Sequence, residues 1–276
     1  MLPSLHHVSL LTGNITATTA FYRDRLGMRL VKNTVNQENL HMRHIFFGDD
    51  SGNPGSVVTF FGVDHLGPRY DEGSHMAALR FAIPASRSDY WQQRLGGMQV
   101  TDPNGVAITL IPVVSERNVP LLGYWGSTLN VVDIEATRRF FAVMMGFDSS
   151  PTQVFLPDSR CLTLNQVAAG THRFGRGSID HIAFSVADTR ELAGLEQTAH
   201  ANGYVIEKLA DRGWFISLYV REPNGNRIEF ATPTPGFTLD EPLAKLGTGL
   251  GLPPHLEAQR PAIASYWQGK GVNFDD

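Results

Sequence analysis

Cysteine is nearly absent from this sequence, because Cys161 is the single one. One cysteine excludes an intrachain disulfide, and it also excludes a structural zinc site built from several thiolates. Without disulfides, a reducing cytoplasm is the default compartment. The opening residues MLPSLHHVSLL lack the charged region of a signal peptide, and two histidines interrupt their apolar run. We therefore expect a cytoplasmic protein.

Long apolar runs and charge of one sign are lacking as well. No stretch of about 18 apolar residues exists, so the sequence predicts no membrane-spanning helix. The net charge is −4 and no basic run stands out, which argues against nucleic acid and anionic membranes as partners. Hydrophobic residues make up 42% of the chain and charged residues 18%, an ordinary globular balance. The 276 residues fit two domains of about 120 residues each.

What the sequence does contain is one pattern repeated four times: a strand-like run, a helical segment and further strand-like runs. The four first strands are expected at residues 5–12, 75–83, 123–132 and 179–187, and the helices at 15–28, 86–96, 133–147 and 189–204. The ends of modules two and four align without gaps, DPNGVAIT at 102–109 against EPNGNRIE at 222–229. Pro-Asn-Gly is a tight-turn sequence that leads into each final strand. The pattern predicts an α+β fold of four βαβββ modules.

Two halves and a tail follow from this repeat. Residues 113–126 link the halves, so we expect one pair of modules in residues 1–115 and a second pair in residues 116–235. The remainder, residues 236–276, is rich in proline and glycine and matches no module. We expect it to form an extended tail packed on the surface.

The repeat also serves as an internal control for candidate ligands. His7 and His181 align in the first strands of modules one and four, where modules two and three carry Ala78 and Gly126. Glu229, in the last strand of module four, aligns with Thr109 of module two; the N-terminal half thus offers one candidate ligand and the C-terminal half two. A requirement of the fold would act on all four modules, whereas a binding site needs only two of them.

Strand alternation places these three side chains on comparable faces. Each lies on the more polar or small-residue face of its strand, for example His7 with Ser9, while the opposite face is apolar. A lone strand histidine is more often structural, and an inward carboxylate often forms a salt bridge. Together, two imidazoles and one carboxylate form the facial triad of non-haem Fe(II) oxygenases, which leaves open positions on the metal. The same triad also accepts zinc or manganese.

With these residues identified, the chain resembles the vicinal oxygen chelate superfamily of glyoxalases, bleomycin-resistance proteins and extradiol dioxygenases. Within it, the chain resembles the ring-cleaving dioxygenases of the hydroquinone type. Four motifs carry the resemblance over nearly the whole chain: LHHVSLLTG (5–13), IDHIAFSV (179–186), DRGWFISLYVREPNGNRIEFAT (211–232) and PGFTLDEPLAKLGTGLGLPPHLE (235–257). The last two are fairly specific to this branch. The resemblance implies two domains of paired modules with cup-shaped mixed sheets, and a homodimer is a candidate assembly.

The resemblance also implies site residues and an activity. Fe(II) would be bound by the second histidine of the opening pair, the module-four histidine and the final glutamate, which are the three residues found above. Further site residues would be His6, Ser9, Arg212 and Tyr219, and His44 is a weaker candidate for the pocket wall. Arg212 can hold an anionic oxygen and Tyr219 can donate a hydrogen bond. His6 is a candidate proton-transfer group, although strand alternation places it opposite His7.

The expected reaction is oxidative opening of a small dihydroxylated aromatic ring by dioxygen. One position departs from the branch, since Asp180 stands where we associate these enzymes with a histidine, and this bears on the substrate. Two alternatives remain open. A glyoxalase-type isomerase or thiol transferase typically uses four protein ligands, and the strand GSVVTFFG (55–62) offers no carboxylate. A metal-free binding or resistance protein would have no need for the three candidate ligands.

Overall fold

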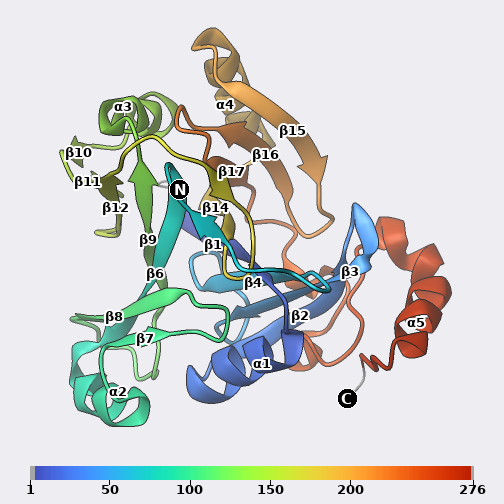
Figure 1. The fold of residues 1–276 in the computed structure, drawn as a ribbon. Helices are drawn as coiled ribbons and strands as arrows, with labels where there is room; N and C mark the ends of the chain where they lie inside the picture. Colours follow the sequence, from blue (N-terminus) through green and yellow to red (C-terminus); the bar gives the residue numbers. More distant parts are fainter. Residues whose placement is uncertain (1–3, 275–276) are drawn as a thin grey trace.

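Strands from the two ends of the chain share one sheet. The computed structural model describes residues 4–274, and its strands form a large sheet of eight strands and another of seven (Figure 1). The larger sheet has the order β15-β16-β17-β14-β1-β4-β3-β2. Its strands are β1 (Ser4–Thr12), β2 (Arg29–Asn36), β3 (Asn39–Gly48), β4 (Val57–Gly62), β14 (Ile179–Ser185), β15 (Val205–Asp211), β16 (Ile216–Arg221) and β17 (Arg227–Ala231). Module one is therefore joined to module four.

The second sheet is built from the middle of the chain. It joins modules two and three in the order β10-β11-β12-β9-β6-β8-β7. Its strands are β6 (His75–Pro84), β7 (Gln99–Thr101), β8 (Ala107–Val113), β9 (Gly123–Val131), β10 (Ser149–Ser150), β11 (Gln153–Phe155) and β12 (Cys161–Gln166). The short strands β5 (Tyr70–Asp71) and β13 (His172–Arg173) pair separately. The predicted α+β class with paired modules is confirmed, and each sheet takes strands from both halves of the chain.

The register of the central strands shows that the four modules are equivalent. In the larger sheet β1 runs antiparallel to β14, with His7 opposite Ala183 and Ser9 opposite His181. In the other sheet β6 runs antiparallel to β9, with Ala78 opposite Thr128 and Arg80 opposite Gly126. The β1–β14 and β6–β9 pairs therefore have the same register at equivalent residues. The alignment of the first strands made from the sequence therefore holds in three dimensions.

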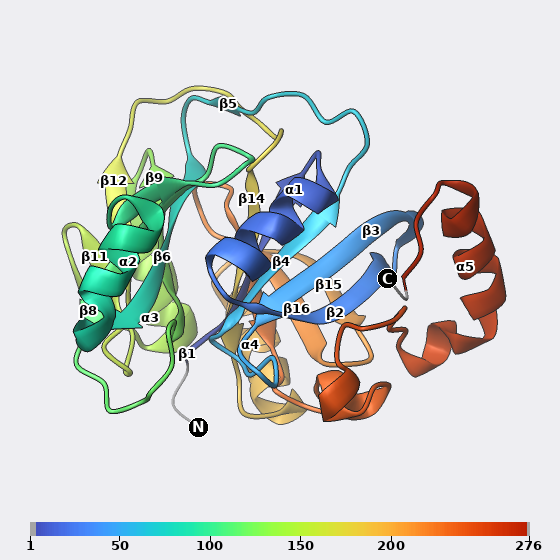
Figure 2. The ribbon, with the colours of Figure 1, turned by 90° about the horizontal axis from the view of Figure 1, so that it is seen from below.

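Each module places its helix on the outer face of its strands. The helices are α1 (Ile15–Thr19), which continues as the π-helix η1 (Ala20–Arg25), α2 (Ser88–Leu95) after the 3-10 turn η2 (Ala85–Arg87), α3 (Ile134–Met145) and α4 (Thr189–Ala201). Three begin at side-chain caps, where Asn14, Asp133 and Asp188 accept backbone N–H groups of the first turn. Figure 2 shows α1 lying along β4 and α2 beside β8.

The core lies between these helices and the sheets. Val8 and Leu10 of β1 are fully buried in it, and Tyr22 of η1 packs its ring 4.7 Å from that of Phe60 on β4. Because successive residues of a strand face opposite sides, burying Val8 and Leu10 on the helix side turns His7 and Ser9 toward the concave side. The core thus fixes which face of β1 is free to form a site.

The C-terminal segment is not extended, so that expectation was wrong. It contains the 3-10 turns η3 (Phe237–Leu239), η4 (Leu243–Lys245) and η5 (Pro254–Gln259), followed by α5 (Arg260–Gly269). Ile263 and Trp267, one helical turn apart, are buried against a cluster that includes Val35 and Leu252. The abundant proline and glycine of the segment made helix α5, with its two buried apolar residues, difficult to predict from the sequence. Among residues 4–274, no helix has the length and apolarity needed to cross a membrane.

The start of this segment is anchored in the larger sheet by a buried lysine. Lys32 of β2 has a fully buried side chain whose Nζ contacts Oδ1 of Asp240 at 2.7 Å and also pairs with Glu241. It donates to the carbonyl of Phe237 at 3.1 Å, and Asp240 also accepts the indole N–H of Trp214 at 2.7 Å. These contacts tie the segment to the loop before β16.

Candidate metal centre

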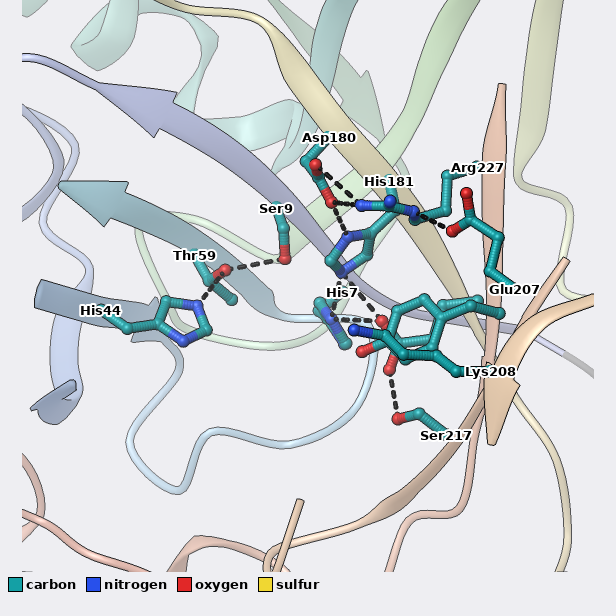
Figure 3. A network of polar contacts seen from close by, with 12 residues as sticks. His7, Ser9, His44, Thr59, Asp180, His181, Glu207, Lys208, Ser217 and Arg227 are labelled. Carbon is teal, nitrogen blue, oxygen red and sulfur yellow. Dashed lines mark hydrogen bonds and ion pairs between the residues drawn. The ribbon is translucent and has the colours of Figure 1, made fainter. Parts of the chain in front are cut away.

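Three strands of the larger sheet bring His7, His181 and Glu229 together. Figure 3 shows the rings of His7 and His181 side by side. Nε2 of His7 lies 3.2 Å from Nε2 of His181 and 3.4 Å from Oε2 of Glu229. Nε2 of His181 lies 2.8 Å from the same carboxylate oxygen. All three residues are at most 3% exposed. β1, β14 and β17 are neighbours in the sheet, so residues far apart in sequence become a single cluster.

The donor set fits a divalent cation. Oε2 of Glu229 is buried, yet no hydrogen-bond donor of residues 4–274 is aimed at it, even though Nε2 of His181 is close. A buried carboxylate oxygen without a partner is costly, and a cation among the three atoms would remove that cost. Two imidazole nitrogens and one carboxylate oxygen are a donor set used by iron, manganese and zinc.

The electrostatics of the three groups also favour a positive charge between them. Burial lowers the pKa of His7, which leaves a neutral ring with a lone pair to donate. Burial also opposes charge on Glu229 and His181. The two histidines beside Glu229 outweigh burial there, and Glu229 and Asp180 outweigh it at His181. The pKa of Glu229 is held well below its usual value, and the pKa of His181 is raised to about 9. Because a metal ligand must be deprotonated, a metal ion at this place would displace the proton from His181.

The equivalent positions of the other modules carry no carboxylate. Strand registers align Glu229 with Thr59 on β4, Thr109 on β8 and Thr163 on β12. In the second sheet, the Arg80 guanidinium donates to Thr163 Oγ1 and to the carbonyl oxygens of Ser127 and Cys161. In modules two and three, a protein cation thus contacts Thr163, the residue equivalent to Glu229.

Each of the three candidate ligands contacts a neighbour that orients it. Nδ1 of His7 lies 2.8 Å from Nδ1 of His6, and Nδ1 of His181 lies 2.6 Å from Oδ2 of Asp180. Ser217 of β16 donates to Oε1 of Glu229 at 2.5 Å. With these outer atoms engaged, Nε2 of both rings and Oε2 of the carboxylate face one another.

A pocket opens on one side of the cluster. The cavity has a volume of about 40 Å³, and the empty space including its open mouth is about 410 Å³. Aromatic and polar side chains line it: His7, Ser9, Asn36, Gln37, His44, Phe46, Phe61, His181, Arg212, Trp214, Phe215 and Tyr219. The aromatic walls suit a flat apolar ring, and the two candidate ligands His7 and His181 form part of the pocket lining.

Of the further residues predicted from the sequence, Ser9, Arg212, Tyr219 and His44 line this pocket. Arg212 Nε donates to the Tyr219 hydroxyl at 3.3 Å. Burial and the charge of Glu229 raise the pKa of Tyr219, so its hydroxyl keeps its proton and remains a donor. Ser9 and His44 are joined through Thr59 by hydrogen bonds of 2.8 and 2.9 Å.

His6 is placed differently, behind His7 and outside the pocket lining. Its ring also packs 5.2 Å from that of Phe215, and burial lowers its pKa to about 3. Sequence reasoning missed the aromatic wall of Phe46, Phe61, Trp214 and Phe215. Alternation in the strand HMRHIFF would have placed Phe46 on the same face as His44.

Comparison with known proteins agrees with this geometry. The chain is 30% identical to “Putative ring-cleaving dioxygenase MhqA” of Bacillus subtilis, with 94% of this chain and 96% of that protein covered. It is 28% identical to “Chlorohydroquinone/hydroquinone 1,2-dioxygenase” of Sphingobium indicum, with 94% of each chain covered. A crystal structure of a “putative dioxygenase” from Bacillus subtilis superposes with a TM-score of 0.85 at 25% identity, covering 95% of both chains.

More distant structures share the fold alone, such as glyoxalase I of Zea mays with a TM-score of 0.63 at 16% identity, covering 84% of this chain and 93% of that one. One family model matches residues 4–110 and again residues 125–230, so that both halves of the chain carry the same pattern. The chain therefore belongs to the Glyoxalase/Bleomycin resistance protein/Dioxygenase superfamily.

Proposed function

We propose that this protein is a metal-dependent, ring-cleaving dioxygenase that acts on a hydroquinone- or catechol-like aromatic, with Fe(II) as its metal. The observation that carries the proposal is a buried triad of His7, His181 and Glu229, whose two histidines line an aromatic-walled pocket. The similarity to ring-cleaving dioxygenases over almost the full chain supports the reaction class.

In this proposal, His7, His181 and Glu229 hold the metal, and three protein ligands leave positions open on the pocket side. Bound Fe(II) would supply a Lewis acid for the phenolic oxygen and a site for dioxygen. Fe(II) is proposed over zinc because ring opening by dioxygen requires a redox-active metal, and over manganese because two imidazoles and one carboxylate are the ligand set typical of Fe(II) oxygenases.

The protein side chains would bind and orient the substrate. Phe46, Phe61 and Phe215 would enclose the ring and exclude water. The Tyr219 hydroxyl, which keeps its proton, would donate a hydrogen bond to an oxygen that gains negative charge, and Arg212 beside it would stabilise that charge. Ser9 would contact a polar group of the substrate from the other side. His6 would act through His7 and not on the substrate, because it lies outside the pocket.

The test is metal content and oxygen uptake of protein purified without oxygen, using a panel of hydroquinones and catechols. We expect about one bound metal per chain and oxygen consumption coupled to loss of the aromatic absorbance. Glu229→Gln should lose both while remaining folded. The matched control is Glu222→Gln, since Glu222 is a buried carboxylate whose oxygens accept hydrogen bonds from Thr137 and Asn226.

The control should cost stability without changing the metal content. Equal metal content and turnover in wild type and Glu229→Gln would refute the proposed site. Metal bound at the triad without oxygen uptake, together with isomerisation of a thiol adduct, would instead favour the glyoxalase-type alternative.

A further inference from the structure

The two imidazoles of the triad are supported by unlike partners. His6 and Asp180 hold equivalent places, one residue before His7 on β1 and before His181 on β14, and each contacts Nδ1 of the following ring. When Nε2 faces a cation, Nδ1 carries the ring proton and donates it. His6 must then accept through an unprotonated nitrogen, so it is a neutral partner, whereas Asp180 is a carboxylate.

Asp180 is itself held firmly. Nη1 of Arg227 contacts its two oxygens at 2.8 and 3.0 Å, and Nε of Arg227 contacts Glu207 at 2.5 Å. Arg221 contacts the other oxygen of Glu207 at 2.5 Å. Charges therefore alternate from the triad outward, through side chains of four adjacent strands. Figure 3 shows Asp180, Arg227 and Glu207 in this order.

This arrangement fixes the position of the carboxylate. Asp180 is 18% exposed and Arg227 26%, so water competes only partly for these contacts. β14 and β17 pair in parallel with His181 opposite Arg227, which sets the guanidinium beside the residue that precedes the ligand. The geometry is that of a carboxylate–histidine–metal series, in which the outer carboxylate fixes the ring orientation and raises the basicity of its nitrogen.

We propose that Asp180 is a positioning residue that makes His181 the stronger imidazole donor of the triad, while the neutral His6 leaves His7 the weaker one. The inference rests on the proposed metal centre and adds a difference in donor strength between its two histidines. It predicts that metal affinity depends more on the residue before His181 than on the residue before His7.

The experiment measures binding of Co(II) to metal-free protein without oxygen, by competition with a chelating dye, together with the visible spectrum of the bound cobalt. Asp180→Ala should raise the dissociation constant about 10- to 100-fold, the range found when such outer partners are lost. Asp180→Asn keeps the size and one acceptor oxygen, so its effect should be smaller. Both should shift the cobalt absorption bands. His6→Gln, which keeps an acceptor beside His7, should change the dissociation constant less than Asp180→Ala.

The matched control is Glu207→Gln, which removes an ionic partner of Arg227 but leaves the contact between Asp180 and His181. Its dissociation constant should stay within about threefold of wild type, well below the change expected for the loss of Asp180. A dissociation constant for Asp180→Asn and Asp180→Ala equal to that of the control, with an unchanged cobalt spectrum, would overturn the inference. If Asp180→Ala fails to fold, the isosteric Asp180→Asn decides it.

The result remains separable from the proposed function. Should wild type and Glu229→Gln bind cobalt equally, the metal centre itself is wrong. Should Glu229→Gln abolish binding while the Asp180 variants bind normally, the centre stands and only the role of Asp180 is refuted.

Discussion

The buried ammonium of Lys32 gives the sharpest prediction about stability. Its side chain is fully buried, and the side chains of its partners Asp240 and Glu241 are 9% and 12% exposed. Lys32→Met keeps the length of the side chain but removes its charge. Two nearly buried carboxylates would then face each other without a cation, and the carbonyl of Phe237 would lose its donor.

Removing one partner of a buried ion pair costs about 3–5 kcal/mol, because the remaining charge is left uncompensated. For a chain of this size, that loss lowers the melting temperature by on the order of 10 °C. The stem of the methionine can still pack on Trp214, whose ring centroid lies 5.0 Å from Nζ of Lys32, so the loss should be mainly electrostatic.

The assay is urea unfolding together with limited proteolysis of the segment after residue 236. A triple variant supplies the control: Lys32→Met with Asp240→Asn and Glu241→Gln removes the cation and both anions. It should recover more than half of the lost free energy of unfolding. A loss below about 1 kcal/mol for Lys32→Met alone, which is the value of an exposed pair, would refute this account of the anchor.

Three further predictions concern the site, the second sheet and acid stability. Tyr219→Phe and Arg212→Ala should keep the metal but lower ring-opening turnover on the order of 100-fold, since each removes a donor aimed at developing charge; full turnover in both, at equal metal content, would discard their proposed role. Arg80→Met should cost about 2 kcal/mol of unfolding free energy, because buried acceptors lose a charged donor, and should leave the metal content at the triad unchanged. Burial raises the pKa of Asp180, but the neighbouring imidazole and guanidinium lower it from 3.8 to about 2. The ionised Asp180 carboxylate therefore stabilises the folded state above pH 3.8, and this contribution is lost as the pH falls toward 2. In metal-free protein, Asp180→Asn should consequently show a smaller loss of unfolding free energy over this pH range than wild type.

The sequence contained enough to predict the fold class and the residues of the triad. His7, His181 and Glu229 could be chosen because the other modules carry Ala78, Gly126 and Thr109, and the strand registers bear out that alignment. Alternation then turned the three side chains to one side. Strand alternation depends only on neighbouring residues, and the comparison of modules depends only on the repeat. Neither argument requires knowledge of which distant residues are in contact.

Other features depend on contacts that no pattern specifies. His6 was expected opposite His7, but the register of β1 shifts between Leu5 and His7, and the ring of His6 lies against that of His7. The contact between Asp180 and Arg227 joins residues far apart in sequence and requires the pairing of β14 with β17. Helix α5 was hidden by the composition of its segment.

Strands from the two ends of the chain share the larger sheet, and this has a consequence for how the protein is synthesised. The proposed ligand His7 on β1 leaves the ribosome first, and Glu229 follows roughly 220 residues later, on the order of ten seconds or more at usual rates of synthesis. For most of that interval β1 has no β14 to pair with, because all strands of the second sheet are synthesised before β14. A nascent chain that stops before β17 holds at most two of the three ligands, whatever its stability. Metal capture would therefore mark a chain that has been synthesised and folded through β17.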